Sequence, residues 1–251
     1  MSNTPYPAYM PSHGYMTEKI QRGYIAAAMK DKTLPENAYR MPEIVTLNAS
    51  KNPSKPIQFW QLYSVLGQKR IVRIIQNFYQ RVYRDEPWFR SVFARIGDTS
   101  HHVSTQSAMW LDVMGGGFNY HGAEFRLNFH HQHNAIELMN KKGAERWITL
   151  MAQTLNDTAE HMTGDPRVRI SINTFLTYFT AKYAADFSFQ TNITFGLTNA
   201  PMKLKMNFMN MPDADIEALT ETELREGLVG RGVHVSEQAD KSGLIKLAKR
   251  L

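Results

Sequence analysis

The chain has 251 residues, of which 43% are apolar and 21% are charged, and this is enough for one sizeable domain with appendages. It contains no cysteine, which excludes disulfides, thiolate nucleophiles, iron–sulfur clusters and CxxCH attachment motifs, and which suits a reducing compartment. The net charge of +6 is modest and the basic residues are scattered, so nucleic acid is not an expected partner.

No apolar run is long enough to cross a bilayer, so we expect no membrane span. The first residues lack a basic stretch followed by an apolar one, so we expect no secretory signal. These observations predict an intracellular protein. They leave cytoplasm and mitochondrion open.

Residues 1–56 are expected to form an extended N-terminal arm, because prolines punctuate this region and favour an extended path. One short helix is predicted from Thr17, a good N-cap, through Met29. The arm also carries several tyrosines and methionines. These side chains could dock onto a partner or fold back onto the chain's own domain, and the sequence leaves both possibilities open.

Residues 57–189 are expected to form the main domain, almost entirely helical. The apolar positions of residues 71–82 fall on one face of a helix that Asp85-Glu86-Pro87 ends. A second helix is expected from near Ser100, with Asp98 and Thr99 as other possible caps, until Gly115-Gly116-Gly117 stops it. Two more helices carry apolar faces at 147–155 and 172–183. Four helices with short connections predict an all-α domain with one shared core.

Residues 190–212 are predicted to be a linker or a short strand pair, and residues 213–251 a small helical module. Thr220 and Glu223 form a capping box, and a final helix follows the extended stretch around Val233. This helix–extended–helix order resembles a SAP-type module, a family often associated with nucleic acid. The segment nevertheless holds eight acidic and six basic residues, a net charge of −2, which opposes phosphate contacts. Protein docking is therefore the favoured interpretation.

Histidines gather in two groups, His101-His102 and His130-His131-Gln132-His133. His102 and Gln106 lie one turn apart on a face that continues through Met109 and Trp110. A polar pair above an apolar stripe is typical of a ligand pocket. The alternative is the exposed end of an amphipathic helix, and for His102 taken alone this alternative is favoured.

Taken together, several segments resemble the truncated haemoglobins. They are LYSVLG at 62–67, IQNFY at 75–79, Val92-Phe93, MGGGFNY at 114–120, HNAI at 133–136 and ERWI at 145–148. The interval from Tyr120 to His133 fits the family without a gap. Two departures are a glycine, Gly117, in place of the family's proline and one inserted residue before Trp147. The resemblance implies a two-on-two helical sandwich that covers about half of the chain.

The resemblance also implies roles for individual residues. His133 would be the proximal ligand of the iron of a b-type haem, and His130 and His131 are rivals for that role. Tyr79, His102 and Gln106 would line the distal side, where His102 could become a sixth ligand. The remaining residues of the implied pocket are Phe93, Met109, Trp110, Tyr120 and Trp147. Plain core packing is the alternative for Phe93 and Trp147. No residue is assigned a catalytic role.

The sequence therefore supports two hypotheses from different classes. The first is a haem protein that binds O₂ or a related diatomic ligand, or does redox chemistry on it. The second is a globin-derived structural subunit of a larger protein assembly, with or without haem, that contacts its partners through residues 1–55 and 213–251. A zinc site built from the clustered histidines is weakest, because no HExxH-type spacing accompanies them.

Overall fold

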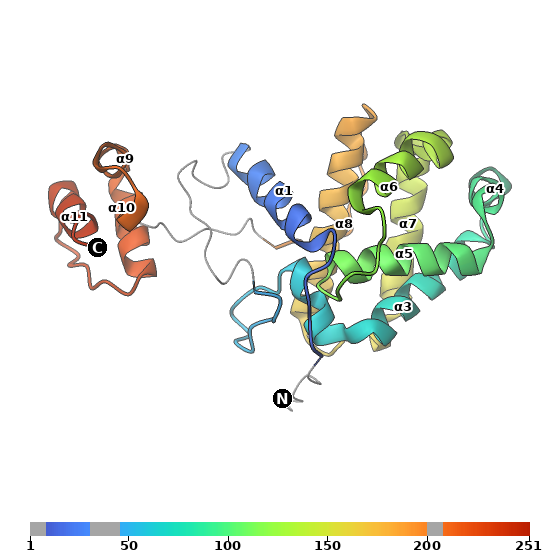
Figure 1. The fold of residues 1–251 in the computed structure, drawn as a ribbon, viewed down its shortest axis with the longest axis horizontal. Helices are drawn as coiled ribbons and strands as arrows, with labels where there is room; N and C mark the ends of the chain where they lie inside the picture. Colours follow the sequence, from blue (N-terminus) through green and yellow to red (C-terminus); the bar gives the residue numbers. More distant parts are fainter. Residues whose placement is uncertain (1–8, 31–45, 200–207) are drawn as a thin grey trace. The chain divides into compact units, whose positions relative to one another are not determined.

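A computed structural model describes residues 9–30, 46–199 and 208–251 of the chain (Figure 1). The chain divides into two compact units, the first built from residues 1–24 and 46–200 and the second from residues 25–45 and 201–251. Helix α1 spans Thr17–Lys30, close to the predicted helix. The remaining helical elements of the first unit are η1 (Phe59–Gln61), α3 (Leu62–Val82), α4 (Pro87–Ile96), α5 (Thr99–Val113), α6 (Ala123–Phe129), η2 (His130–Asn134), η3 (Ile136–Leu138), α7 (Lys141–Asp157), η4 (Ala159–His161) and α8 (Pro166–Asp186).

Helix boundaries in the first unit follow from the local sequence. Asp98 caps α5 by accepting a hydrogen bond from the backbone N–H of His101, so it is the cap among the three candidates. Prolines open α4 and α8, where a missing N–H costs nothing. Helix α3 begins earlier than the periodicity indicates and is kinked at Gly67, whose φ of 65° is left-handed.

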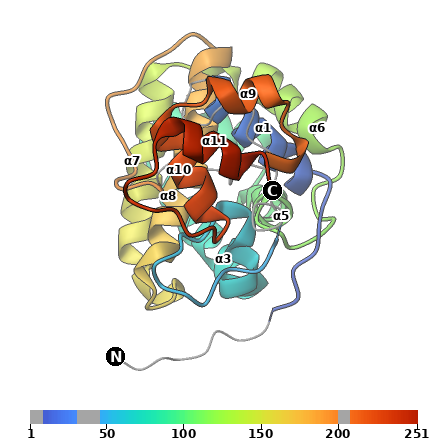
Figure 2. The same cartoon turned by 90° about the vertical axis from the view of Figure 1, so that its left-hand side faces the viewer.

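Two pairs of helices, α3 with α5 and α7 with α8, form the domain. Helix α3 packs mainly against α5 and α7. In Figure 1 helix α5 lies nearly horizontal while α7 and α8 stand upright, and in Figure 2 α5 is seen end-on while α7 and α8 remain upright. The α7–α8 pair therefore crosses α5 steeply, which confirms the predicted all-α, two-on-two arrangement. The shared core holds the largest fully buried side chains, among them Trp60, Phe78, Phe89 and Phe175.

Residues 9–24 of the N-terminal arm fold back onto this domain. Met16 and Ile20 are buried in it, and the backbone N–H of Ser12 donates to the carbonyl of Gly115 at 2.9 Å. The fully buried carboxylate of Asp112 accepts hydrogen bonds from the backbone N–H groups of Tyr15 and Met16 at 3.2 and 2.8 Å. Of the two possibilities for the arm, folding back holds for residues 9–24. The predicted arm also includes residues 1–8 and 31–45, which lie outside the described ranges.

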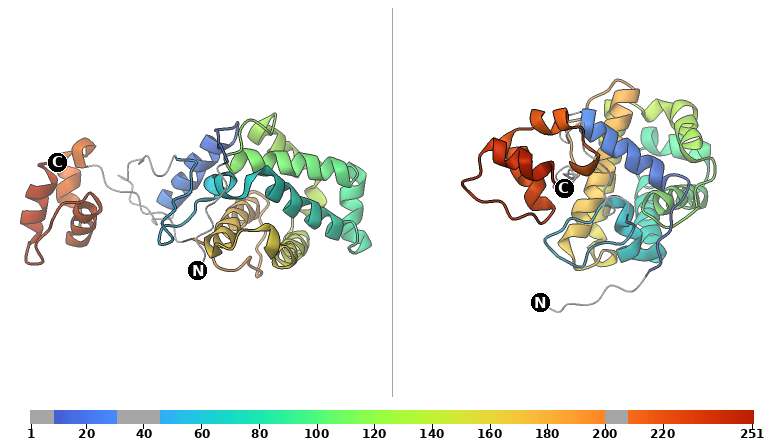
Figure 3. Two further views of the ribbon diagram at one scale, coloured as in Figure 1. Left: turned by 90° about the horizontal axis from the view of Figure 1, so that it is seen from below. Right: turned by 60° about the vertical axis from the view of Figure 1, so that its left-hand side comes forward.

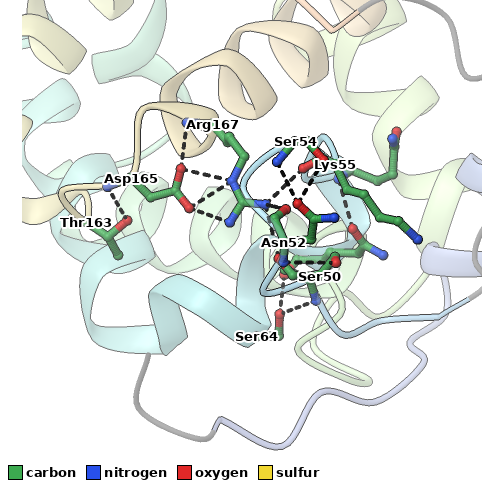
Figure 4. Close-up of polar contacts among 11 residues, drawn as sticks. Ser50, Asn52, Ser54, Lys55, Ser64, Thr163, Asp165 and Arg167 are labelled. Atoms are coloured by element: carbon green, nitrogen blue, oxygen red, sulfur yellow. Dashed lines mark hydrogen bonds and ion pairs between the residues drawn. The ribbon is translucent and has the colours of Figure 1, made fainter. Parts of the chain in front are cut away.

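The loop before α3 is tied to the N-terminus of α8 by a single guanidinium group, that of Arg167 (Figure 4). Asp165 caps α8 and forms an ion pair with Arg167. The Nη1 atom of Arg167 donates to the carbonyls of Ser50, Asn52 and Lys55 at 3.1, 2.7 and 2.8 Å. An Arg fork with several carbonyl acceptors holds an irregular loop in one conformation.

The second unit holds η5 (Phe208–Asn210), α9 (Asp213–Ala218), α10 (Glu221–Gly230) and α11 (Lys241–Ala248), which cluster together in both views of Figure 3. Its core includes Phe208, Ile216, Leu224 and Leu244. The predicted capping box of Thr220 and Glu223 is present, whereas α9 was not predicted. Residues 190–199 of the predicted linker form no strand. Across the described residues of both units, no helix is long and apolar enough to span a membrane.

Candidate functional site

A cavity of about 410 Å³ lies inside the first unit. Residues from α3, α4, α5, α6, η2, η3, α7 and α8 line it, and most of the lining is apolar or aromatic. The structure brings eight residues singled out from the sequence to this one cavity: Tyr79, Phe93, His102, Gln106, Met109, Trp110, Tyr120 and Trp147. It does not bring His133 there, but it does bring the two rivals, His130 and His131, together with His101. Such an apolar cavity with a few polar groups is the usual form of a ligand or cofactor site.

One side of the cavity holds a hydrogen-bonded pair on α3 and α5. The Tyr79 hydroxyl donates to Oε1 of Gln106 at 2.5 Å. Burial, with Tyr83 nearby, raises the pKa of Tyr79 well above its usual range, so the phenol keeps its proton. The bond occupies the amide oxygen of Gln106 and leaves its NH₂ group as a donor toward the cavity side. This pair therefore supplies hydrogen-bond donors opposite the η2 segment.

His102, on α5, is tied to the end of α4. Its Nε2 atom lies 2.9 Å from the carbonyl oxygen of Phe93, and its ring stacks on Tyr79 at 5.1 Å between centroids. A carbonyl only accepts, so Nε2 carries the proton in this contact. Burial lowers the pKa of His102, which keeps the ring neutral near pH 7. As placed, the ring would have to release Phe93 before Nε2 could bind a metal as a sixth ligand.

The η2 segment brings His130 and His131 to the cavity. Nδ1 of His131 lies 2.8 Å from the carbonyl oxygen of Leu127, and its ring packs against Tyr183 at 4.2 Å. Burial lowers the pKa of His130 and of His131 to about 4 each, so both rings are neutral near pH 7. Because Nδ1 of His131 donates its proton to Leu127, Nε2 keeps its lone pair.

His133 lies elsewhere than the resemblance implied. Its ring is exposed, stacks on Phe129 at 4.2 Å, and has Nδ1 3.1 Å from the Phe129 carbonyl. The physical reason is the inward face of α6, which is set by buried Leu127. One helical turn after Leu127 comes His131, whereas one turn after the exposed Phe129 comes His133. Both histidines follow an apolar residue by four positions in the sequence, so this spacing alone does not separate them, and the burial of Leu127 does.

The floor of the cavity is held by the glycine turn and Tyr120. The backbone N–H of Tyr120 donates to Oδ2 of Asp112 at 3.2 Å, and the Arg126 guanidinium lies 4.8 Å from the centre of its ring. Gly117 has φ 94°, which proline cannot adopt. This turn therefore requires a residue in the left-handed region at position 117, which glycine provides and the family's proline could not.

Sequence reasoning missed several residues of the lining, notably Leu138, Phe179 and Tyr183. Phe179 and Tyr183 lie one turn apart on α8, so the apolar face of the last helix was the available signal. No group of three His, Asp or Glu side chains that could hold a metal ion occurs in the part of the chain that the structure describes. The imidazoles of this cavity instead suit a cofactor that needs one axial nitrogen.

A two-on-two helical core around an apolar cavity lined by imidazoles is similar to the arrangement of a globin. Residues 61–179, just under half of the chain, match the family model of the bacterial-like globins. The chain is 29% identical over 110 residues to the group 2 truncated hemoglobin 3-1 of Lotus japonicus, which covers 43% of this chain and 64% of that protein. It is 28% identical over 100 residues to the two-on-two hemoglobin-3 of Arabidopsis thaliana, which covers 39% of this chain and 56% of that protein.

The chain thus spans less than two thirds of the length of these two relatives. No solved structure matches the chain. The SAP-type resemblance of residues 213–251 has no counterpart among these matches.

Proposed function

We propose that the globin domain binds b-type haem non-covalently in the cavity, with Nε2 of His131 as the axial ligand of the iron. The observation that carries this proposal is the bond between Nδ1 of His131 and the Leu127 carbonyl. Histidines that bind metals almost always donate their other ring N–H to a carbonyl, carboxylate or water, which fixes the tautomer and the ring orientation. His131 is thus the protein ligand in place of His133, whose ring faces away from the cavity.

The rest of the lining fits the same cofactor. The cavity, at about 410 Å³, lies in the usual range for ligand sites. Phe93 on α4, Trp110 on α5 and Trp147 on α7 give it aromatic walls that exclude water. The chain has no cysteine, so no thioether link to a porphyrin can form.

When bound, haem would supply an iron centre for O₂ or a related diatomic ligand, or for redox chemistry on it. The chain's contribution on the distal side is hydrogen bonding. Tyr79 orients the Gln106 amide through their 2.5 Å bond, and the amide then presents N–H donors to a polar ligand. Donors of this kind decide whether a bound ligand is stabilised or activated.

The test is haemin titration of the purified apo-protein. We expect stoichiometric uptake with a Soret band, a shift of that band when the reduced protein meets carbon monoxide, and complete loss of the haem on acid–butanone extraction. An apo-protein that takes up no haemin would contradict the proposal. Haem that survives extraction would contradict the non-covalent part.

A second candidate function, membership of a larger protein assembly, is favoured by exposed aromatic rings. Phe118 is 64% exposed and packs edge-on against Tyr15, and Phe125 on α6 is 80% exposed. Large exposed apolar groups mark contact sites for partners. The contact surface would then include the folded-back arm, and the second unit could add a further docking module.

This candidate is tested by native electrophoresis of extracts that contain the full chain. We expect the protein to migrate in a high-mass complex, and the double variant Phe118→Ser/Phe125→Ser to leave that complex while it still takes up haemin. Migration of the unmodified protein as a single chain would contradict assembly membership.

A further inference from the structure

Two histidines compete for one position on the η2 side of the cavity. His130 and His131 both line the cavity, and their rings meet edge-on at 5.1 Å. Each imidazole could offer a nitrogen to an iron. A mechanism must therefore select one of them.

The local backbone does not select by itself. Residues 130–134 form a π-helical turn, and the backbone N–H of Ala135 donates to the carbonyl of His130 five residues earlier, at 2.9 Å. A π-turn inserts one extra residue into the helical register, and such turns are frequent at functional sites. Both adjacent side chains of this turn reach the cavity lining, so contacts from outside the turn are needed to hold one of them in a fixed orientation.

One outside contact reaches His131. The ring of Tyr183, on α8, lies 4.2 Å from the His131 ring, with a tilt of 31° between the two planes. The contact spans two elements far apart in the chain, η2 and α8. It covers one face of the imidazole, while the Leu127 carbonyl holds the Nδ1 edge at 2.8 Å. A face and an edge together fix both side-chain torsions of a histidine.

Tyr183 is itself well fixed. It lies in the last two turns of α8, where Phe179, one turn earlier, packs beside it with ring centroids 6.1 Å apart. The ammonium group of Lys182 lies 5.7 Å from its ring centre and is paired with Asp186 at 2.7 Å. The α8 helix thus presents the Tyr183 ring to η2 as a rigid wall.

We propose that Tyr183 is a positioning residue that selects His131 over His130 as the haem ligand by stacking on its imidazole face. This inference rests on the proposed haem-binding function. Tyr183 would then act on the iron site through the orientation of the His131 ring. The aromatic ring performs this role, and the phenol hydroxyl is not required for it.

The experiment compares the full chain with Tyr183→Phe, which keeps the ring, and Tyr183→Leu, which removes it. Each is made with His130 intact and with His130→Ala. The readout is the iron–histidine stretching band of the reduced, haem-loaded protein in resonance Raman spectra, together with the rate of haem loss to an excess of apomyoglobin. Tyr178→Leu is the matched control, because Tyr178 is an aromatic residue of the same helix that packs on Phe59 instead of on a histidine.

We expect one band in the unmodified protein and the same band in Tyr183→Phe and Tyr178→Leu. In Tyr183→Leu we expect a second band, which disappears when His130→Ala is added, and haem loss that is about 10- to 100-fold faster, the usual cost of losing a partner behind a metal ligand. An unchanged band in Tyr183→Leu would overturn the proposal. So would a second band that persists in the His130→Ala background.

A further measurement separates this proposal from the proposed function. In the apo-protein, nitrogen NMR of labelled histidine reports which nitrogen of His131 carries the proton. We expect a single tautomer, protonated at Nδ1, in the unmodified protein and in Tyr183→Phe, and a tautomer mixture in Tyr183→Leu. If the unmodified protein takes up no haemin, the proposed function fails and ligand selection fails with it. If haemin is bound but Tyr183→Leu keeps the single tautomer and band, only the positioning role fails.

Discussion

Two histidines that line one cavity from different helical segments, His131 on η2 and His102 on α5, are each held by a backbone carbonyl, yet their free ring nitrogens differ. His131 is held through Nδ1 by Leu127 at 2.8 Å, and His102 is held through Nε2 by Phe93 at 2.9 Å. Because a carbonyl only accepts hydrogen bonds, the ring nitrogen in contact with it carries the proton, and His131 keeps the lone pair on Nε2, the ring nitrogen farther from its own backbone. His102 has its far nitrogen engaged. The difference between the two tautomers therefore makes one residue a candidate metal ligand and the other a tether between α4 and α5.

The largest effect on haem binding is expected from removing the imidazole of His131. In His131→Ala we expect loss of stoichiometric haemin uptake, because no other imidazole in the described cavity lining is held by a carbonyl at Nδ1 with Nε2 left free. His133→Ala is the matched control, since that exposed ring should leave uptake and spectrum unchanged. Haemin titration followed at the Soret band measures both. Loss of uptake in His133→Ala, with His131→Ala unaffected, would reverse the assignment.

The next largest effect concerns the turn that leads from the α5 side of the cavity to the α6 side. Asp112 accepts backbone hydrogen bonds from Tyr15, Met16 and Tyr120 in a fully buried setting. Asp112→Ala leaves these N–H groups without an acceptor, and we expect the free energy of unfolding to fall by about 3 kcal/mol. Chemical denaturation of the apo-protein measures this change.

The conservative variant Asp112→Asn keeps one acceptor oxygen and should lose clearly less stability than Asp112→Ala. Equal stability of Asp112→Ala and the unmodified protein would mean that the folded-back arm contributes nothing to the domain. The connection between α5 and α6 would then be held by contacts other than those of Asp112.

A smaller effect on stability is expected from removing the imidazole of His102, which tethers α5 to α4. His102→Leu removes one of the two donors to the Phe93 carbonyl, which keeps the backbone N–H of Gly97 at 3.1 Å, and we expect a loss of about 1 kcal/mol in stability. Haemin uptake should persist, and the spin state of the loaded protein should match that of the unmodified protein, because Nε2 of His102 is engaged by Phe93. Absorption spectra check this directly. A change from a low-spin to a high-spin spectrum in His102→Leu would show that His102 leaves Phe93 and binds the iron.

The smallest expected effect is a pH-dependent change in stability at the ion pair between Asp85 and Arg146, which lies outside the cavity lining. Asp85 forms an ion pair and hydrogen bonds with Arg146 at the start of α7, and these contacts lower the pKa of the Asp85 carboxyl. A lowered folded-state pKa stabilises the protein above the unfolded-state value, and this contribution is lost as the pH falls through the folded-state value. Asp85→Asn should therefore be less stable by about 1 kcal/mol near pH 7, since Arg146 is partly exposed.

The difference between Asp85→Asn and the unmodified protein should shrink below about pH 4, where the carboxyl of the unfolded chain also becomes protonated. Thermal melts across the acidic range measure it, and haemin uptake should be unchanged throughout. A constant difference in stability at all pH values would show that the ion pair is not its source.

The sequence predicted what local patterns determine. The period of Ile71, Ile74 and Phe78 placed α3, and Asp98 was among the caps named for α5, because side chains three or four residues apart share a helix face and caps act over one turn. The face that runs from His102 to Trp110 indicated the cavity wall for the same reason.

What the sequence did not reveal depends on contacts between distant segments or on a change of helix register. Asp112 binds the backbone N–H of Met16, which lies 96 residues away, and such a bond has no local signature. The placement of His131 at the cavity, with His133 exposed, follows from the inward position of Leu127, which the family spacing does not show. A count from Tyr120 measures distance along the chain, whereas burial of Leu127 determines which face of the helix turns inward.

The most direct test of the central claim is a crystal structure of the full chain loaded with haemin. We predict electron density that joins the iron to Nε2 of His131, with Nδ1 still on the Leu127 carbonyl and His102 still on the Phe93 carbonyl. Electron density that joins the iron to His130, His133 or His102 in place of His131 would contradict the account, in which the tautomer makes His131 the ligand and His102 a tether.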